Sequence, residues 1–406
     1  MFMKYISRRK FLGLIALGNA VAAFPSIGLA DQGFRDFVAK FKSVALKSGV
    51  SAQVYDAAFA GIDSIDPEVL EKARFQPEFK APVWDYFDNR VHERSVANGQ
   101  AMAKKFRPWL DKIEARFGVD RHILLAIWSM ETNYGEILKR PEVIRSTIRS
   151  LATLAYADKA RSKFGRTQLI GALKILQRGD IDVAGLQGSW AGAMGHTQFI
   201  PTSFMAYGVD IDGDGRRNIW TSVPDALASS ANLLKRNGWQ TGRTWGYEVL
   251  LPQGTKFPTG AASIDNWAGI GVERASGKPF RNGGDGATLK LPDGRSGPAF
   301  LVMKNFRVIK AYNNADKYAL AVGVLADRIS GSHELVRDWN RPFTAINIAE
   351  KEELQGLLLK AGFYDGKVDG NVGNGTKTAI LAYQQAKGLT QDGYASKEFL
   401  TVLRRR

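Results

Sequence analysis

One stretch of the chain combines a dense apolar run with a carboxylate that could perform acid–base chemistry. The run from Ile123 to Gly135 is too apolar for a helix with one wet face, so we expect a helix that is buried almost all round and stops near Gly135. Glu131 stands at its end, four and three residues after Ile127 and Trp128, which should flank it. Such surroundings raise the pKa of a carboxyl group, which suits a general acid and base. The alternative is a Glu that pairs with an arginine or caps a backbone, the commoner outcome for an isolated Glu.

A second stretch, residues 185–201, is rich in glycine and also carries polar side chains. Its small residues let backbone approach backbone or a ligand closely. Ser189, Trp190, His196 and Gln198 offer hydrogen-bonding and stacking groups that suit a polar sugar. A tight helix–helix corner that needs glycine for packing explains the composition about equally well, so the residues alone leave both interpretations open.

The third landmark is an acidic loop in which Asp210, Asp212 and Asp214 occupy alternate positions. A glycine follows at the sixth position and a backbone carbonyl, that of Arg216, at the seventh, as at the front of an EF-hand loop. Three acids this close repel one another without a cation, which favours a metal site over a solvated turn. The twelfth position holds Thr221 instead of Glu, so the nearest downstream acid, Asp225, becomes the candidate closing ligand. We therefore expect a structural Ca²⁺ on these oxygens and no organic cofactor.

Composition limits the class of protein. The chain has 406 residues, of which 45% are hydrophobic and 11% aromatic, so it is globular and long enough for two or three domains. It contains no cysteine, which excludes disulfides, thiol nucleophiles, zinc–thiolate sites and a cysteine-linked lipid anchor. Its net charge of +16 suggests attraction to anionic wall polymers or membrane surfaces, or to nucleic acid in a cytosolic protein.

Residues 1–30 have the pattern of an export signal. A basic start precedes an apolar run from Leu12 to Phe24, and small residues end the segment. The run is short and interrupted by glycine, so it predicts no membrane span. Arg8 and Arg9 stand in a context that resembles the bacterial twin-arginine signal. We therefore expect a soluble periplasmic protein, a location that argues against nucleic acid as the partner, and the mature chain keeps a charge of +12.

The remaining patterns predict a mainly helical, α+β chain. Helical periodicity covers residues 33–117, 146–176, 224–237 and 311–322. Between about 240 and 308 the character changes to strands separated by Gly/Pro-rich turns, with strands expected at 247–251, 299–303 and 306–309. A boundary near Trp339 separates a last segment of about 60 residues, a size that can fold alone.

In order and spacing, these landmarks resemble the membrane-bound lytic murein transglycosylase B family over roughly residues 34–335. The resemblance is carried by Glu131–Gly135, Ser189–Gly195 with Gln198–Pro201, the loop from Asp210, and Tyr312–Asn314. It implies a lysozyme-like core with helical and small β subdomains in a catalytic domain of residues 31–338. It also implies cleavage of peptidoglycan glycan strands.

The tail, residues 344–406, resembles a small helical peptidoglycan-binding module. The matching motifs are Gly362–Gly370, Thr376–Ile380 and Tyr383–Gln385. The usual Gly-Pro before the threonine is replaced here by Gly373-Asn374-Gly375. We expect the module to keep its fold despite this change. The matching motifs do not identify which of its residues bind the wall.

By this resemblance, Glu131 is the single catalytic acid and base. It protonates the oxygen of the β-1,4 bond between N-acetylmuramic acid and N-acetylglucosamine, and then accepts the proton of the C6 hydroxyl, which closes onto C1 as a 1,6-anhydro ring. The resemblance further implies that Ser189 hydrogen-bonds Glu131 or the acetamido group of the muramic acid, and that Gln198 contacts a sugar. Asn313 would orient the acetamido group or the intermediate, and Tyr134 and Tyr312 would line the groove. For the two tyrosines, a purely structural role is nearly as well supported.

Two other functions remain open at this stage. A muramidase would release reducing ends by hydrolysis, and a wall-binding protein with a decayed site would cleave nothing. We expect a monomer whose partner is peptidoglycan, with other wall enzymes as unidentified further partners.

Overall fold

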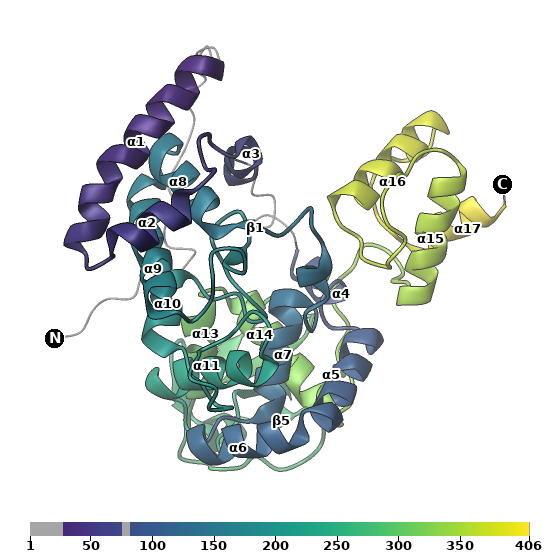
Figure 1. Cartoon of the computed structure of the whole chain (residues 1–406). Coiled ribbons are helices and arrows are strands. Elements are labelled where there is room, and N and C mark those ends of the chain that lie inside the picture. Colours follow the sequence, from purple (N-terminus) through teal and green to yellow (C-terminus); the bar gives the residue numbers. More distant parts are fainter. Residues whose placement is uncertain (1–26, 75–81, 406) are drawn as a thin grey trace. The chain divides into compact units, whose positions relative to one another are not determined.

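The computed structural model describes residues 27–74 and 82–405 (Figure 1). Contacts divide the chain into two compact units. The first holds the described residues up to 74 with Gly99–Trp245 and Lys304–Ala326. The second holds residues 82–98, Gly246–Met303 and 327–405. No helix in the described ranges is long and apolar enough to cross a lipid bilayer.

The first unit is almost entirely helical. Its helices pack around α7 and α8, whose leucine and isoleucine side chains are buried. The helices and short strands that lie in this unit or enter it are α1 (Ile27–Lys47), α2 (Ala52–Phe59), α3 (Pro67–Arg74), α5 (Glu93–Lys105), α6 (Arg107–Phe117), α7 (Arg121–Thr132), η2 (Glu136–Lys139), β1 (Arg145–Ser146), α8 (Thr147–Ala157), α9 (Ser162–Arg178), β2 (Gln187–Gly188), α10 (Pro201–Tyr207), α11 (Val223–Arg236), α13 (Lys304–Tyr312) and α14 (Asp316–Ile329).

The second unit contains an antiparallel sheet with strand order β4-β6-β7-β3-β5. Its core is built around Trp267, which is fully buried and donates its indole N–H to the carbonyl of Ala287 at 3.1 Å. The elements of this region are β3 (Gly246–Leu250), β4 (Ala262–Ser263), α12 (Ile264–Gly269), β5 (Glu273–Arg274), β6 (Gly286–Lys290) and β7 (Ala299–Val302). The small antiparallel sheet expected between about 240 and 308 is therefore present.

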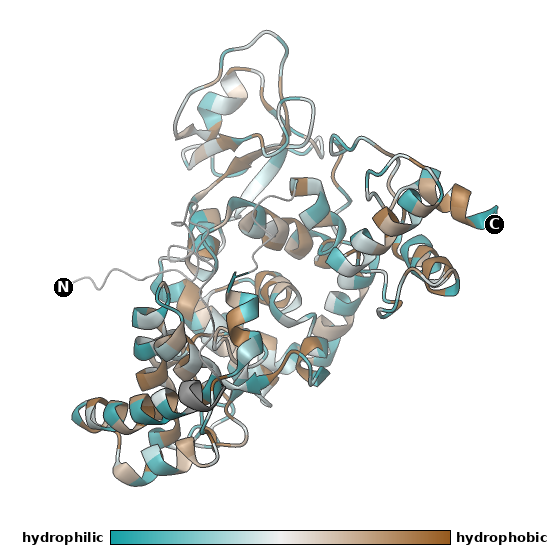
Figure 2. Ribbon diagram, turned by 90° about the horizontal axis from the view of Figure 1, so that it is seen from above, coloured by the Kyte–Doolittle hydropathy of each residue, from teal (hydrophilic) through white to brown (hydrophobic). Residues whose placement is uncertain are grey.

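The tail of the second unit forms a small three-helix module, with α4 (Val83–Asp88) elsewhere in the same unit. Helices α15 (Ile348–Lys360), α16 (Asn374–Ala386) and α17 (Lys397–Arg404) enclose a core that includes Leu354, Ile380 and Leu400. Each helix shows brown apolar residues beside teal polar ones, as expected when one face packs inward (Figure 2). The mainly α fold class with a helical C-terminal module is confirmed.

One local prediction is wrong, and two stretches predicted to be helical are helical but interrupted. Residues 306–309, expected as a strand, lie inside helix α13. Phe306, Val308 and Ile309 are all buried, and so short an apolar run does not by itself distinguish a buried helix segment from a strand. The helix expected over 146–176 is two helices, α8 and α9, separated by a turn at residues 158–161. The helix expected at 311–322 is also divided, because α13 ends at Tyr312 and α14 begins at Asp316.

The export signal predicted for residues 1–30 lies outside the described residues, except that α1 begins at Ile27. The division into domains of residues 31–338 and 344–406 stays a prediction.

The helix at 304–312 is anchored by Asn305, which yields a test of the fold. Its fully buried side chain accepts from the N–H of Gln240 at 2.8 Å and donates to the carbonyls of Gln240 and Arg243 at 2.9 and 2.7 Å. Asn305→Ala removes three hydrogen bonds made by a fully buried side chain, so we expect the free energy of unfolding to fall by on the order of 3 kcal/mol. Chemical denaturation measures it. Asn266→Ala, an exposed change in α12, is the control, and an equal effect of both variants would refute this role.

Candidate active site

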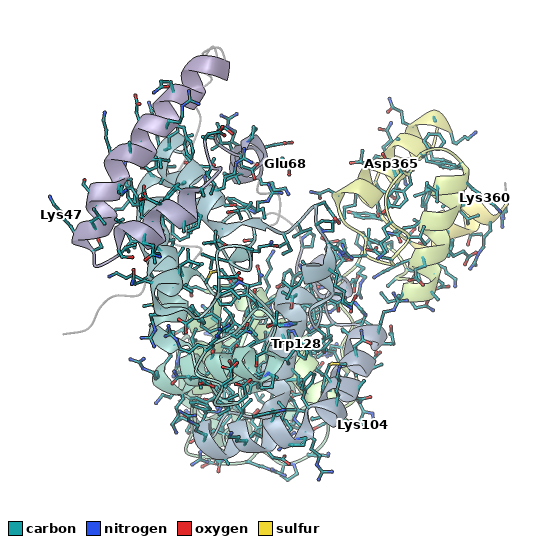
Figure 3. All side chains as sticks on the ribbon, viewed as in Figure 1. Lys47, Glu68, Lys104, Trp128, Lys360 and Asp365 are labelled. Atoms are coloured by element: carbon teal, nitrogen blue, oxygen red, sulfur yellow. The ribbon has the colours of Figure 1, made fainter. Side chains whose placement is uncertain are left out.

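Helix α7 brings one carboxylate out of an otherwise buried segment. The helix begins after Asp120, whose carboxylate accepts the N–H of His122 at 2.7 Å. From Ile123 to Thr132 every residue is buried except Glu131, which is partly exposed. The predicted buried helix is therefore present, and Figure 3 labels Trp128 one turn before its end. The fold leaves the Glu131 side chain accessible while its neighbours pack.

The chain turns sharply after Glu131. Asn133, Tyr134 and Gly135 all have positive φ values, of 48°, 56° and 92°. At Gly135 the left-handed backbone favours glycine, and a Cβ there would also lie 2.7 Å from the His196 ring. The end of the helix is thus packed directly against the glycine-rich loop.

Two hydrogen bonds tie helix α7 to His196 in that loop. The indole N–H of Trp128 donates to Nδ1 of His196 at 3.2 Å, and the hydroxyl of Thr132 donates to its carbonyl at 2.7 Å. Burial lowers the pKa of His196 to about 4, so the ring is neutral at neutral pH and can accept the indole proton. This histidine therefore holds the helix end and does not serve as a proton donor at neutral pH.

Glu131 receives a hydrogen bond from a residue that the sequence analysis did not select. The hydroxyl of Tyr318, on α14, donates to Oε1 of Glu131 at 2.9 Å. Tyr318 is only 2% exposed, so its hydroxyl is held in place by packing. The one sequence signal was its position six residues after Tyr312, within an apolar helical pattern that also fits simple core packing.

Ser189 lies just after a short antiparallel pair. Strand β1 pairs with β2, with Arg145 opposite Gly188. The Ser189 N–H donates to the carbonyl of Ala193 at 2.7 Å, and its hydroxyl accepts the N–H of Ala193 at 3.1 Å. A Cβ on Gly188 would lie 2.4 Å from the Ala193 carbonyl oxygen, so backbone packing requires glycine there. Ser189 itself is partly exposed.

Gln198 and Tyr312 meet at the other end of the same loop. Gln198 has a positive φ of 53° and donates from Nε2 to the carbonyl of Gly195 at 3.0 Å. The hydroxyl of Tyr312 donates to the carbonyl of Thr197, and its ring packs edge-on against Phe199. The loop of residues 187–199 therefore links the helix end, Ser189, Gln198 and Tyr312.

Asn313 and Tyr134 differ in what they offer. Oδ1 of Asn313 is buried and has no hydrogen-bond donor among the described residues, so it could accept a bond from a ligand. Tyr134 is 9% exposed, and its hydroxyl hydrogen-bonds to the Ser129 side chain. This placement fits the structural alternative for Tyr134 better than a groove-lining role.

The acidic loop gathers three of its predicted ligands. Carboxylate oxygens of Asp210, Asp212 and Asp214 lie within 4.8 Å of one another. Burial opposes ionisation of Asp210, but bonds from the N–H groups of Gly213 and Gly215 outweigh it and lower the pKa. Hard oxygen donors of this kind fit Ca²⁺.

Asp225 is not brought into that cluster. It is fully buried, and its two carboxylate oxygens accept the backbone N–H groups of Ile211 and Asn218 at 2.9 and 2.8 Å. Burial, together with the charges of Asp212 and Asp210, raises its pKa to about 6. Asp225 therefore closes the loop by holding its backbone, and the structure gives no support for it as a cation ligand.

Most of the chain matches known protein families. Residues 33–327 match the transglycosylase SLT domain family, and residues 349–403 match a peptidoglycan-binding domain family. Membrane-bound lytic murein transglycosylase B of Escherichia coli is 30% identical over 241 residues, which span 58% of this chain and 64% of the relative.

Solved structures extend the likeness over most of the chain. The crystal structure of SltB3 from Pseudomonas aeruginosa in complex with NAG-NAM-pentapeptide is 44% identical, with a TM-score of 0.72 over 92% of this chain and all of that one. E. coli Slt35 in complex with calcium is 26% identical, with a TM-score of 0.60 over 73% of this chain and 92% of that one. The chain belongs to the lytic transglycosylase family of the membrane-bound lytic murein transglycosylase B type, with a lysozyme-like core and a C-terminal peptidoglycan-binding module.

Proposed function

We propose that the protein is a peptidoglycan lytic transglycosylase that cleaves the β-1,4 bond between N-acetylmuramic acid and N-acetylglucosamine without water. The observation that carries this proposal is Glu131, the partly exposed carboxylate at the end of a buried helix, with the Tyr318 hydroxyl on Oε1. The SltB3 structure with NAG-NAM-pentapeptide supports the same substrate class.

In the first step Glu131 gives its proton to the glycosidic oxygen as the bond to C1 breaks. The sugar passes through an oxocarbenium-like state, and N-acetylglucosamine leaves with its O4 protonated. The hydrogen bond from Tyr318 favours the carboxylate that this step produces, because a donated hydrogen bond stabilises the charged form. It also fixes the direction of the Glu131 side chain.

In the second step the Glu131 carboxylate takes the proton of the muramic acid C6 hydroxyl. The O6–C1 bond forms, the product carries a 1,6-anhydro ring, and Glu131 regains the proton that it gave away. Outside the acidic loop, whose carboxylates we assign to Ca²⁺, the family motifs contain Glu131 as their only carboxylate, so these motifs offer no second acidic group to activate water. This is why we favour ring closure over hydrolysis.

The other site residues bind and orient the sugar in this proposal. Asn313 accepts an acetamido N–H with its unpartnered Oδ1, while Ser189 and Gln198 hydrogen-bond the glycan from the loop. Tyr312 holds the loop through the carbonyl of Thr197 and adds an aromatic edge.

A structural Ca²⁺ would be held by Asp210, Asp212, Asp214 and the Arg216 carbonyl. The convergence of the three carboxylates supports this site, as does the solved structure of E. coli Slt35 in complex with calcium. The ion would fix the start of α11, because Ser222, its N-cap, donates to Asp212 at 2.9 Å.

Export and wall binding complete the proposal. The twin-arginine-like signal would deliver the chain to the periplasm, where the module of residues 344–406 and the positive charge hold it on the wall as a monomer. The match to a peptidoglycan-binding domain family supports the second point.

Digestion of purified sacculi tests the chemistry. We expect anhydro-muropeptides from the mature protein, and a rate lower by about 10²- to 10⁴-fold or more for Glu131→Gln, which cannot transfer the proton. Mass spectrometry of the products measures both. Glu136→Gln, an exposed glutamate five residues on that pairs with Lys139, is the matched control and should cleave normally.

Other products would change the conclusion. Reducing ends from the mature protein would identify a muramidase, and an absence of any product would favour a wall-binding protein without activity.

Calcium binding can be measured by thermal unfolding. At a free Ca²⁺ concentration of about 100 times the Kd, the free energy of unfolding should rise by ~2.7 kcal/mol. Asp212→Asn combined with Asp214→Asn should remove this gain, while Asp338→Asn, an exposed acid outside the loop, should keep it. An identical melting temperature of the unsubstituted protein in calcium and in chelator would rule the site out.

A further inference from the structure

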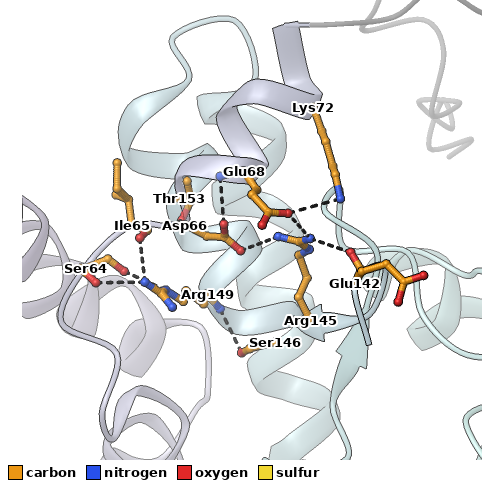
Figure 4. Close-up of polar contacts among 10 residues, drawn as sticks. All are labelled: Ser64, Ile65, Asp66, Glu68, Lys72, Glu142, Arg145, Ser146, Arg149 and Thr153. Atoms are coloured by element: carbon orange, nitrogen blue, oxygen red, sulfur yellow. Dashed lines mark hydrogen bonds and ion pairs between the residues drawn. The ribbon is translucent and has the colours of Figure 1, made fainter. Parts of the chain in front are cut away.

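An ionic cluster surrounds Arg145 (Figure 4), whose strand pairs with Gly188, the residue before Ser189. Its centre is Arg145 in strand β1, whose guanidinium donates to Asp66 and to Glu68, each at 2.8 Å. The side chains of Arg145 and Asp66 are only 13% and 16% exposed, whereas Glu68 is 61% exposed. Because solvent screens the Glu68 contact, the pair with Asp66 is the stronger constraint.

Asp66 is itself held firmly in the first unit. Its Oδ1 accepts the N–H of Glu68 at the start of α3, and its own N–H donates to the buried hydroxyl of Thr153 at 2.9 Å. The Arg149 side chain donates to the carbonyls of Ser64 and Ile65, just before it. Asp66 and the two residues before it are therefore hydrogen-bonded to helix α8, which fixes the carboxylate that Arg145 contacts.

The apolar side of helix α3 lies close to the segment that carries Ser189. Val69 and Ala73 of α3 form a buried cluster with Leu154, and Trp190 packs against this cluster. Trp190 directly follows Ser189, and Gly188, directly before it, pairs with Arg145 across β1 and β2. Both chain neighbours of Ser189 are therefore held in place. Trp190 packs against the α3 cluster, and Gly188 pairs with Arg145, which is bonded to Asp66.

We propose that Arg145 and Asp66 are positioning residues that fix Ser189 for sugar binding through the pairing of β1 with β2, an inference that rests on the proposed function of Ser189. Among the described residues the Arg145 guanidinium donates to Asp66, Glu68 and the carbonyl of Glu142, whereas α7 is held separately through His196. Loss of the pair loosens residues 187–193, which weakens substrate binding and leaves proton transfer at Glu131 nearly unchanged.

The test compares Arg145→Gln with Arg145→Lys and Glu68→Gln. In Arg145→Gln we expect faster amide hydrogen exchange at Ser189 and Gly192, KM higher by about fivefold and kcat within about twofold. Arg145→Lys keeps a positive charge facing Asp66 and should recover most of the binding. Glu68→Gln changes the exposed partner of the same guanidinium and should resemble the unsubstituted protein in all three measurements.

Two further measurements keep the proposal open to refutation. Asp66→Ser keeps a side chain that can cap α3 but removes the charge opposite Arg145, so it should repeat the Arg145→Gln result even if the arginine variant folds poorly. Binding of a soluble tetrasaccharide of alternating N-acetylglucosamine and N-acetylmuramic acid, measured in a Glu131→Gln background, should weaken by the same about fivefold factor.

The outcomes separate this inference from the proposed function. Three outcomes would each overturn the positioning role. The first is unchanged amide exchange at residues 187–193 in Arg145→Gln, and the second is an effect of Glu68→Gln equal to that of Arg145→Gln. The third is a fall in kcat with KM unchanged. An unsubstituted protein that yields no anhydro-products would instead overturn the transglycosylase proposal, whereas the exchange and binding measurements would still decide whether the pair holds Ser189.

Discussion

The site depends on the burial of α7, because this burial decides where a carboxylate can stand. An ionised carboxylate in an apolar interior is costly unless it is paired, so Glu131 can lie only where the helix reaches a partly exposed position. The left-handed backbone from Asn133 to Gly135 ends the helix at that point. His196 then holds the helix end through Trp128 and Thr132, and the Tyr318 hydroxyl holds the Glu131 carboxylate itself. A rigid carboxylate at an open helix end is what an acid–base catalyst requires.

Much of this site could be predicted from the sequence, because its parts are local. The buried helix, the glycine-rich loop and the acidic loop are each continuous stretches with a recognisable pattern of residue types. Tyr318 was not found, because it lies 187 residues from Glu131 and its helix reads as ordinary core packing. Nothing within a short window of sequence shows which buried hydroxyl will reach a distant carboxylate.

The errors share this physical origin. The strand expected at 306–309 failed because a short apolar run fits either element, and the deciding constraint was Asn305, whose partners lie 62 to 65 residues away. Asp225 was selected as a cation ligand because it is the nearest acid to the loop. In the structure its carboxylate accepts two backbone N–H groups of the loop, so proximity in sequence identified a residue that contacts the loop, while its role as a cation ligand stays a prediction.

The two sides of the site are held by different forces, and this difference has consequences. Glu131 is fixed by apolar packing of α7 and by hydrogen bonds to a neutral histidine, neither of which depends strongly on ionic strength. Ser189 is supported through the charged pair of Arg145 and Asp66, and about a seventh of each of these two side chains is exposed. Salt and solvent can therefore reach the pair. We therefore expect added salt to weaken the support of Ser189 more than the position of Glu131. The two sides of the site can in this way be told apart by their response to ionic strength.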